Sequence, residues 1–413
     1  MTITPVEGHG FFYNDEFYDV GQYGPGEQPE EPPFREVLPW LHPFNENTFW
    51  NTPVGADATY LSTSSAQHQN LTQNNNSNIG LNYNNWSDPF YLATDSDPLM
   101  EVEQRSVLPT NWQNVGSGQT GGTSGQGVLQ QRYTGIRIPT NANWQSTSNT
   151  DRKVIVVQPE VTFQRYNASN QLISTQVFPA GTLSIEMHKF YRVTGGEKIL
   201  TTNMSWCDMR GYGMGYGAFA GGVSMSQGYI RRWEWDAAAA GDHTAIRHAL
   251  KIGLPASKLK SGQIWPASHQ DGSANDDPPR GYHGENPMGT FFVLNKATNI
   301  DSLSLAPTTK AIAWTLQNFG AYVLIQAGTG PINFGIESTP PHLSSGVIET
   351  TRNQIKDVLL PHFRIVANSN DVGPLHSGGD LNRHPIDQSR IAGGGARNES
   401  LRPLPINPEG PWV

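Results

Sequence analysis

Four residues have side chains that could take part in lyase chemistry on a sugar: His188, Tyr191 and His269 could transfer protons, and Arg232 could neutralise a carboxylate. A lyase that acts on acidic polysaccharides needs a His or Tyr base and a cation that neutralises the substrate carboxylate. His188 and Tyr191 lie in the segment SIEMHKFYR, whose alternation predicts one strand with Glu186 and His188 on the same face. Strand spacing alone does not bring a base and a cation together, so ordinary packing and hydrogen bonding are the competing interpretation.

A second group of residues could bind a ligand without chemistry. Aromatic rings on a protein with few charges could form a platform that stacks against sugars, although most tryptophans of a large β protein pack in its core. Polar residues in a loop on a rigid β scaffold are further candidates for ligand contact. The ligand-binding candidates are Trp233, Trp235, Trp265, Tyr282, His283 and Glu285.

The sequence matches metal and nucleotide motifs poorly. His243 and His248 are five positions apart, which does not place both on one helical face as a zinc motif with i, i+4 spacing does. The acidic residues of the loop SHQDGSANDDPPRGYHGENP do not have the ligand spacing of a calcium loop. The run GYGMGYGAFAGG has the glycines of a phosphate loop but lacks its GK[ST] ending. We therefore expect no metal and no cofactor.

The composition argues against two kinds of partner. A net charge of −9 argues against a nucleic-acid surface, which is basic. No apolar run reaches the ~18 residues that a membrane span needs. The first residues, MTITPVEGHGFFYNDEFYDV, have neither the basic nor the apolar part of a secretory signal. We expect no nucleic acid and no membrane as partner, and assembly in the cytoplasm.

The strand signals predict a mainly β fold, an antiparallel β-sandwich or jelly-roll-like domain with one or two short helices. From Arg132 onward the segments YTGIRIP, KVIVVQPEVTFQRY, TQVFPAGTLSIEMHKFYRV and EKILTTNMSW are apolar or alternate over strand length, and turn residues separate them. Strands so close in sequence favour antiparallel pairing. We expect this domain over 41–370, loop-rich over 41–130 and with its core strands in 131–370.

Two segments have helix signals. Asp242 has the residue type of an N-cap for HTAIRHALK, with Gly253 at the end of that segment. Thr308 or Thr309 could cap KAIAWTLQNF, whose apolar residues approximate a helical stripe and which Gly320 follows. The segment AYVLIQAG after it predicts a strand.

Both ends of the chain have the composition of extended arms. Residues 1–40 and 371–413 are rich in Gly and Pro and show no periodicity. The first arm nevertheless carries many aromatic residues, which a solvated tail has little use for. We expect the arms to bind neighbouring subunits of a particle, and the protein to be a homo-oligomer.

The order of several short motifs resembles that of an uncharacterised family of bacterial secreted or surface proteins. These motifs are FWNTPVGADATYL, KVIVVQPEV, SIEMHKFYRV, HALKIGLP, QIWPASH, PMGTFFVL and TLQNFGAYVLIQAG, and the resemblance covers roughly residues 44–370. The positions that fall on the family pattern are His248, Trp265, Pro266, His269 and Gly289. The resemblance implies a β-sandwich from a polymer-degrading or surface context. Ser268 stands where the pattern has Arg in "WPARH", and QAGTG replaces "ADNG", so charge-dependent roles of those positions are not implied.

Two functional hypotheses follow. The first is a structural or adhesive component of an assembled particle, a phage virion above all, whose sandwich binds a cell-surface glycan and whose arms bind other subunits. The missing export signal, the few charges and the aromatic arms favour it. The alternative is a polysaccharide lyase or depolymerase with His188, Tyr191, His269 and Arg232 near a cleft. A lectin-like protein would share the binding surface without the chemistry.

Overall fold

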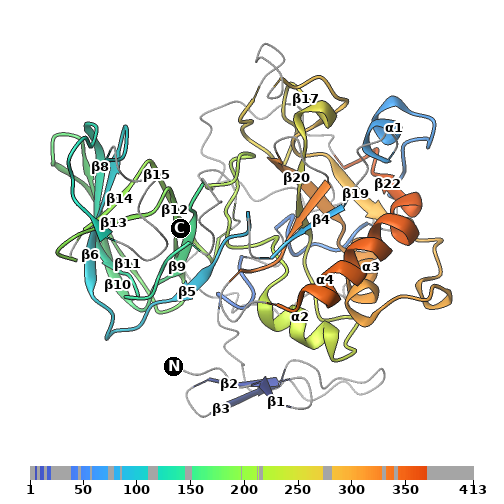
Figure 1. The fold of residues 1–413 in the computed structure, drawn as a ribbon, viewed down its shortest axis with the longest axis horizontal. Helices are drawn as coiled ribbons and strands as arrows, with labels where there is room; N and C mark the ends of the chain where they lie inside the picture. Colours follow the sequence, from blue (N-terminus) through green and yellow to red (C-terminus); the bar gives the residue numbers. More distant parts are fainter. Residues whose placement is uncertain are drawn as a thin grey trace.

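A computed structural model describes most of the chain between residues 39 and 369 (Figure 1). The described ranges are 39–44, 48–55, 58–72, 79–83, 86–109, 120–144, 151–196, 198–211, 213, 217–272, 281–327, 332–338 and 343–369. Three short strands nearer the N-terminus, β1 (Pro5–Val6), β2 (Gly10–Tyr13) and β3 (Glu16–Asp19), form an antiparallel sheet. Apart from residues 39 and 40, the remaining residues of the two predicted arms lie outside the described residues.

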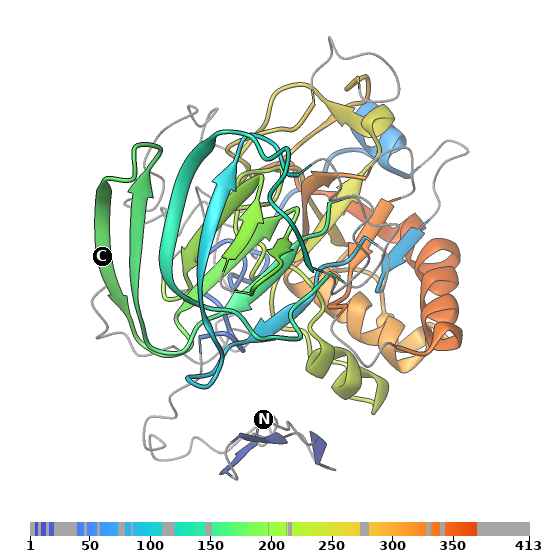
Figure 2. The same ribbon diagram turned by 60° about the vertical axis from the view of Figure 1, so that its left-hand side comes forward.

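The fold is mainly β and contains a β-sandwich, as the sequence predicts. One layer is a seven-stranded sheet and the other a four-stranded sheet (Figure 2). In spatial order, the seven strands are β11 (Leu172–Phe178), β10 (Val161–Asn167), β8 (Leu129–Arg137), β6 (Leu99–Arg105), β14 (Lys198–Thr201), β13 (Tyr191–Val193) and β7 (Thr120–Gly121). The four strands are β15 (Asn203–Asp208), β12 (Leu183–His188), β9 (Val154–Val157) and β5 (Phe90–Leu92).

Apolar side chains that point inward from both sheets fill the space between them. Tyr133 and Ile136 of β8 and Phe163 of β10 turn inward and meet Ile185 and Met187 of β12 in one hydrophobic cluster. On β8 and β10, the residues next to these in sequence turn to the outer face of the seven-stranded sheet, because successive side chains of a strand point to opposite sides.

The four-stranded sheet is buried on both faces and is therefore the middle layer of the molecule. Val154 and Val156 of β9 belong to the sandwich core, whereas Ile155 and Val157 pack into a second and larger hydrophobic cluster. The continuous apolar run VIVV is typical of such a strand, since neither face meets water.

The second cluster surrounds a mixed six-stranded sheet with helices on its far side (Figure 1). In spatial order the strands are β22 (Phe363–Ile365), β19 (Phe291–Leu294), β20 (Ala321–Gln326), β16 (Leu250–Leu254), β21 (Ile332–Gly335) and β4 (Ile79–Asn82). The α-helices of the described ranges are α1 (Ala66–Thr72), α2 (Arg232–Ala239), α3 (Pro307–Asn318) and α4 (Ser345–Gln354). Two further short strands, β17 (Leu259–Lys260) and β18 (Asn286–Pro287), pair with each other.

The molecule thus contains more than a sandwich within 41–370. It has two large hydrophobic clusters. The second contains residues from segments that come before the sandwich in the sequence and from segments that come after it. The part that we expected to be loop-rich, 41–130, contributes α1 and strands β4, β5 and β6. The structure describes four α-helices where the sequence predicted one or two. The boundaries of the predicted domain and arms remain predictions.

The first predicted helix is wrong. Asp242 does not cap a helix; its Oδ1 accepts hydrogen bonds from the backbone N–H and the hydroxyl of Thr244, at 2.8 and 2.9 Å, which closes a local turn instead. The apolar residues that follow form β16, which lies between β20 and β21. The helix lies earlier, in α2, where the carboxylate of Glu234 accepts a hydrogen bond from the backbone N–H of Arg231 at 2.8 Å.

The second predicted helix is confirmed as α3, with a different first residue. Ala306 is its N-cap and Pro307 its first helical residue, a position at which proline has no N–H to leave unpaired. Thr308 is inside the helix, where its hydroxyl lies 2.7 Å from that of Thr351 on α4. Gly320 follows the helix with a φ of +71°, as expected for a glycine that ends a helix. The predicted strand after it is β20.

The segment SIEMHKFYR is not one strand. Lys189 has a φ of +61°, and this left-handed residue interrupts the extended backbone. The chain leaves the four-stranded sheet after His188 and enters the seven-stranded sheet at Tyr191. The alternation that we extended from Glu186 to Tyr191 therefore does not apply across Lys189.

Among the described residues, no helix has both the length and the apolar character needed to cross a bilayer.

Candidate functional site

The four candidates for lyase chemistry lie on four different elements. His188 ends β12, where its Nδ1 lies 3.2 Å from the hydroxyl of Thr202 and its Nε2 3.6 Å from Asp151. Tyr191 is fully buried on β13 and donates a hydrogen bond to the carbonyl of Gly122 at 2.8 Å. Each of these side chains thus has a partner of its own in the sandwich.

The other two candidates lie outside the sandwich. Arg232 begins α2, and its Nε contacts both carboxylate oxygens of Asp236 at 3.0 and 3.1 Å. His269 is exposed in the loop after Trp265, with its Nδ1 2.7 Å from the hydroxyl of Ser268. Arg232 therefore contacts Asp236, whereas His188, Tyr191 and His269 each have other partners. The structure does not assemble the predicted base and cation into one site.

The predicted sugar-stacking rings are mostly inside the protein. Trp265 is 3% exposed and packs edge-on against Phe49 and Tyr322. Trp235 is also buried, and Tyr282 is buried with its hydroxyl donating to Asp271. These three rings have no free face for a ligand. The other ligand-binding candidates are more accessible: Trp233 and Glu285 are half-buried, and His283 is exposed.

The residues with the most unusual environment instead lie between the middle sheet and the second hydrophobic cluster. Glu186 of β12 is completely buried. Its carboxylate accepts hydrogen bonds from the backbone N–H of Ala218 at 3.0 Å and of Met225 at 2.7 Å. It also accepts hydrogen bonds from the hydroxyls of Ser224 and, at 3.2 Å, Ser226. Burial raises the pKa of Glu186, and these hydrogen bonds act in the opposite direction.

A second buried polar contact lies beside the first. Tyr229 donates a hydrogen bond to Asp88, which precedes β5 of the middle sheet. The ammonium group of Lys251, on β16, lies 4.2 Å from the centre of the Tyr229 ring and 5.4 Å from that of Phe219. Burial lowers the pKa of Lys251 to about 7; the charge of Asp88 opposes this shift, and that of Lys153 adds to it.

Lys153 connects this contact to the loop of His269. Its burial alone would lower its pKa, but the carboxylates of Asp88, Asp151 and Asp271 together raise it. Asp151, 3.6 Å from Lys153, would have a raised pKa through burial, yet the hydrogen bond from His188 and the charge of Lys153 hold its pKa well below the usual range. These groups form a network of opposite charges, and burial and the neighbouring charges together account for the direction of each pKa shift.

Two further buried polar contacts hold α2 against its surroundings. His248 lies 3.1 Å from Glu234, whose carboxylate also accepts the hydrogen bond from the N–H of Arg231, the N-cap of α2. The Nδ1 atom of His248 lies 2.9 Å from the carbonyl oxygen of Ala249. Arg231 pairs with Glu337 at 2.9 Å, and its guanidinium lies 3.9 Å from the centre of the Phe90 ring. Arg231 therefore joins α2 to β5, and His248 joins α2 to the segment before β16.

These buried groups fix the layers of the protein against one another. Their partners are protein atoms, so in this arrangement they hold structure and do not face a substrate. In the described part of the chain, no three His, Cys, Asp or Glu side chains gather as metal ligands do.

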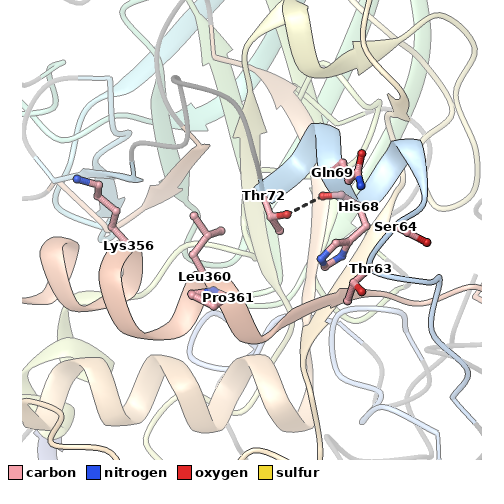
Figure 3. A pocket seen from close by; sticks show the side chains of 8 residues that line it. All are labelled: Thr63, Ser64, His68, Gln69, Thr72, Lys356, Leu360 and Pro361. Carbon is pink, nitrogen blue, oxygen red and sulfur yellow. Dashed lines mark hydrogen bonds between the residues drawn. The ribbon is translucent and has the colours of Figure 1, made fainter.

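An open groove of about 560 Å³ lies between α1 and the segment that precedes β22 (Figure 3). Its described lining consists of Thr63, Ser64, His68, Gln69, Thr72, Lys356, Leu360 and Pro361. Figure 3 shows His68 and Thr72 on the α1 side, across from Leu360 and Pro361. Burial, with a smaller contribution from the charge of Arg364, lowers the pKa of His68 and keeps the imidazole neutral. This lining holds none of the predicted site residues and no carboxylate, so it has room for a small polar ligand but no acid–base pair.

The outer face of the seven-stranded sheet presents a continuous polar surface. Tyr166 of β10 lies opposite Arg132 of β8, whose guanidinium is 4.0 Å from the centre of the tyrosine ring. The Tyr166 hydroxyl donates to Gln164 at 3.0 Å, and Gln164 also accepts a hydrogen bond from Thr134 at 3.1 Å. All four side chains are partly exposed.

The same face continues across β6 and β14 as alternating charges. Arg132 pairs with Glu101 at 2.7 Å, and Lys198 lies 3.0 Å from Glu101 and also pairs with Glu103. Beyond them Leu108, Tyr191 and Leu200 form a small apolar cluster. The candidate Tyr191 thus belongs to the outer side of the sheet but is buried within this cluster, whereas Tyr166 is partly exposed.

No protein-family model, curated protein or solved structure matches this chain. The family resemblance of the motifs therefore stays a prediction, and function has to be argued from the geometry alone.

We predict that Glu186→Gln destabilises the protein by about 2–3 kcal/mol. The new amide places an N–H₂ group against N–H and O–H donors, so at least one buried donor loses its acceptor. The free energy of unfolding from urea titration measures this. Glu160→Gln, at an exposed position in the same sandwich, is the control and should stay within about 0.5 kcal/mol of the unchanged protein. Equal effects of the two substitutions would contradict a special role of Glu186.

We predict that stability rises with pH above neutrality because of Lys251. The unfolded chain binds a proton on this lysine up to pH 10.5, whereas the folded chain binds it only up to about pH 7. Between these values the unfolded state binds more protons, so the free energy of unfolding rises with pH, by up to about 1.4 kcal/mol per unit. The stabilising contribution is complete above pH 10.5 and is lost as the pH falls through 7.

Urea titrations at pH 7, 8 and 9 with Lys251→Met test this dependence. The variant should lose most of the rise between pH 7 and 8. Burial also lowers the pKa of Lys258, to about 8. The free energy of unfolding therefore also rises with pH through Lys258, at a higher pH, and the Lys251→Met variant keeps that rise. Lys260→Met, at an exposed position, is the control and should leave the whole dependence unchanged. A slope that persists in Lys251→Met at pH 7–8 would refute the assignment.

Proposed function

We propose that this protein is a non-enzymatic binding component of an assembled particle, such as a virion, and that its sandwich recognises a glycan. The observation that carries the binding part is the outer face around Tyr166, an accessible row of ring, guanidinium, amide and hydroxyl groups. The particle part rests on the sequence alone, on the aromatic residues in its Gly- and Pro-rich segments.

The chemistry of this face suits a sugar polymer. Planar amide and guanidinium groups can hydrogen-bond to two neighbouring hydroxyls, and an aromatic ring can cover the apolar side of a pyranose. The strands hold these side chains in fixed positions, so little conformational freedom is lost when a ligand binds. An extended chain of sugars could cross β8 and β10 and contact several of these side chains at once.

The charges of the face favour a neutral glycan. Arg132 and Lys198 are paired with Glu101 and Glu103 and so are not free to neutralise a substrate carboxylate. The chain also has a net charge of −9, which repels acidic polymers at a distance. Both features weigh against the predicted alternative, a lyase acting on acidic polysaccharides.

Binding of the full chain to an array of immobilised bacterial polysaccharides, neutral and acidic, tests the proposal. We predict that Tyr166→Ala weakens binding to the neutral glycan it selects at least tenfold, about 1.4 kcal/mol. Tyr83→Ala, at a half-buried tyrosine near β4 and outside the sandwich, is the matched control and should bind normally.

Two outcomes would overturn the proposal. One is binding that Tyr166→Ala leaves unchanged, or no binding to any polysaccharide on the array. The other is an increase in ultraviolet absorbance from new unsaturated ends when the protein is incubated with an acidic polysaccharide, which would show the lyase activity that we argue against.

A further inference from the structure

The groove beside α1 has the size of a small-molecule site. Its volume is about 560 Å³, and such sites measure roughly 300–1,000 Å³. Figure 1 shows α1 on the opposite side of the molecule from β10, which carries Tyr166. A ligand in this groove would therefore occupy a site separate from the proposed glycan-binding face.

His68 of α1 lines this groove with a ring that makes no hydrogen bond through Nδ1. The residue is 4% exposed, and its Nδ1 is buried without a hydrogen-bond partner among the described residues. The backbone of His68 is nevertheless well held. Its N–H donates to the hydroxyl of Ser65 at 3.2 Å, and its carbonyl accepts from the hydroxyl of Thr72 at 2.8 Å. The imidazole is thus fixed beside the groove although the fold does not use Nδ1.

The surroundings of His68 determine which nitrogen carries the proton. Burial and the charge of Arg364 lower the pKa of His68, so its imidazole is neutral and has one N–H donor and one acceptor nitrogen. A buried N–H without an acceptor is rarer in proteins than a buried unpaired acceptor. The unpaired Nδ1 is therefore the acceptor, and the proton is on Nε2. Since Nδ1 is the buried nitrogen, Nε2 is the one that can donate into the groove.

The charged groups next to the groove are mainly positive. Arg364 donates to the backbone carbonyls of Pro361 at 3.1 Å and Phe363 at 2.6 Å, and no described carboxylate pairs with it. Lys356 lines the groove and lies 3.8 Å from Asp357, a weak contact because both side chains are exposed. The net charge of −9 belongs to the whole chain, and salt screens charges that are more than about 8 Å away. The local charge therefore favours an anion.

We propose that this groove binds a small organic anion, a carboxylate or a phosphate monoester, whose oxygen accepts a hydrogen bond from Nε2 of His68. Figure 3 shows Leu360 and Pro361 across from His68, where they can contact the apolar part of such a ligand. The side-chain amide of Gln69 supplies a further donor on the α1 side. A neutral molecule would gain nothing from Lys356 and Arg364, so charge is what selects the ligand.

Ligand-detected NMR of the full chain with four small probes tests this site. Benzoate and phenyl phosphate carry an oxyanion on an apolar ring, benzyl alcohol has the ring without the charge, and inorganic phosphate has the charge without the ring. We expect one or both of the ring anions to bind at least about tenfold more tightly than benzyl alcohol, because a charged acceptor strengthens the hydrogen bond. Inorganic phosphate should bind more weakly than the ring anions. The anion that binds more tightly identifies carboxylate or phosphate as the preferred group.

His68→Phe tests the role of the imidazole. The substitution keeps a ring of similar shape and removes no hydrogen bond of the fold at Nδ1, so the protein should remain folded. Affinity for the preferred ring anion should fall at least about tenfold, the effect of losing one hydrogen bond to a charged group, while that for benzyl alcohol stays the same. His283→Phe, at an exposed histidine outside the groove, is the matched control and should bind like the unchanged protein.

Three results would overturn the proposal: no binding of either ring anion, equal binding of benzyl alcohol, or anion binding that survives His68→Phe. Tyr166→Ala should leave anion binding unchanged, because Tyr166 lies in the sandwich. The anion site and the proposed glycan-binding face can therefore fail independently of each other.

Discussion

The buried carboxylate of Glu186 is the contact on which the layered structure depends. Burying an ionised carboxylate costs several kcal/mol unless hydrogen bonds replace its water. Here two backbone N–H groups and two hydroxyls of the segment 217–226 replace that water. The segment is thereby fixed against the middle sheet, and it leads directly to Tyr229 and Arg231, which contact the same sheet at Asp88 and Phe90. The sandwich and the second hydrophobic cluster are joined by these polar contacts as well as by apolar packing.

This division of the molecule also separates its roles. The buried charges lie where the middle sheet meets the second cluster, and their partners are other protein groups. The accessible groups around Tyr166 lie on the opposite side of the sandwich, away from that interface. A protein that recognises a surface needs a rigid scaffold behind an open face. In the function that we propose, the interface around Glu186 would supply the rigidity and the outer sheet the face.

Much of the fold could be predicted from the sequence, because runs such as KVIVVQ and turns such as NASNQ specify strands locally. The predictions failed at two places: the side chain of Asp242 closes a local turn where a helix cap was expected, and Lys189 adopts a positive φ that moves the chain between sheets. The candidate site was less predictable. Asp88 and Tyr229 are 141 positions apart, and nothing local indicates that they meet. The alternation of FQRY does place Gln164 and Tyr166 on one face, a signal that could have been followed. The burial of Trp265 agrees with the competing interpretation that tryptophans of a large β protein pack in its core.

Backbone hydrogen exchange of the whole protein, followed by mass spectrometry, tests most directly whether the layers form one unit. If Glu186 fixes the segment 217–226 to the middle sheet, peptides from that segment and from β9 and β12 should exchange with the same opening free energy. They should also respond together to mild denaturant. Rapid exchange of 217–226 while β9 and β12 remain protected would contradict the central role that we assign to this carboxylate.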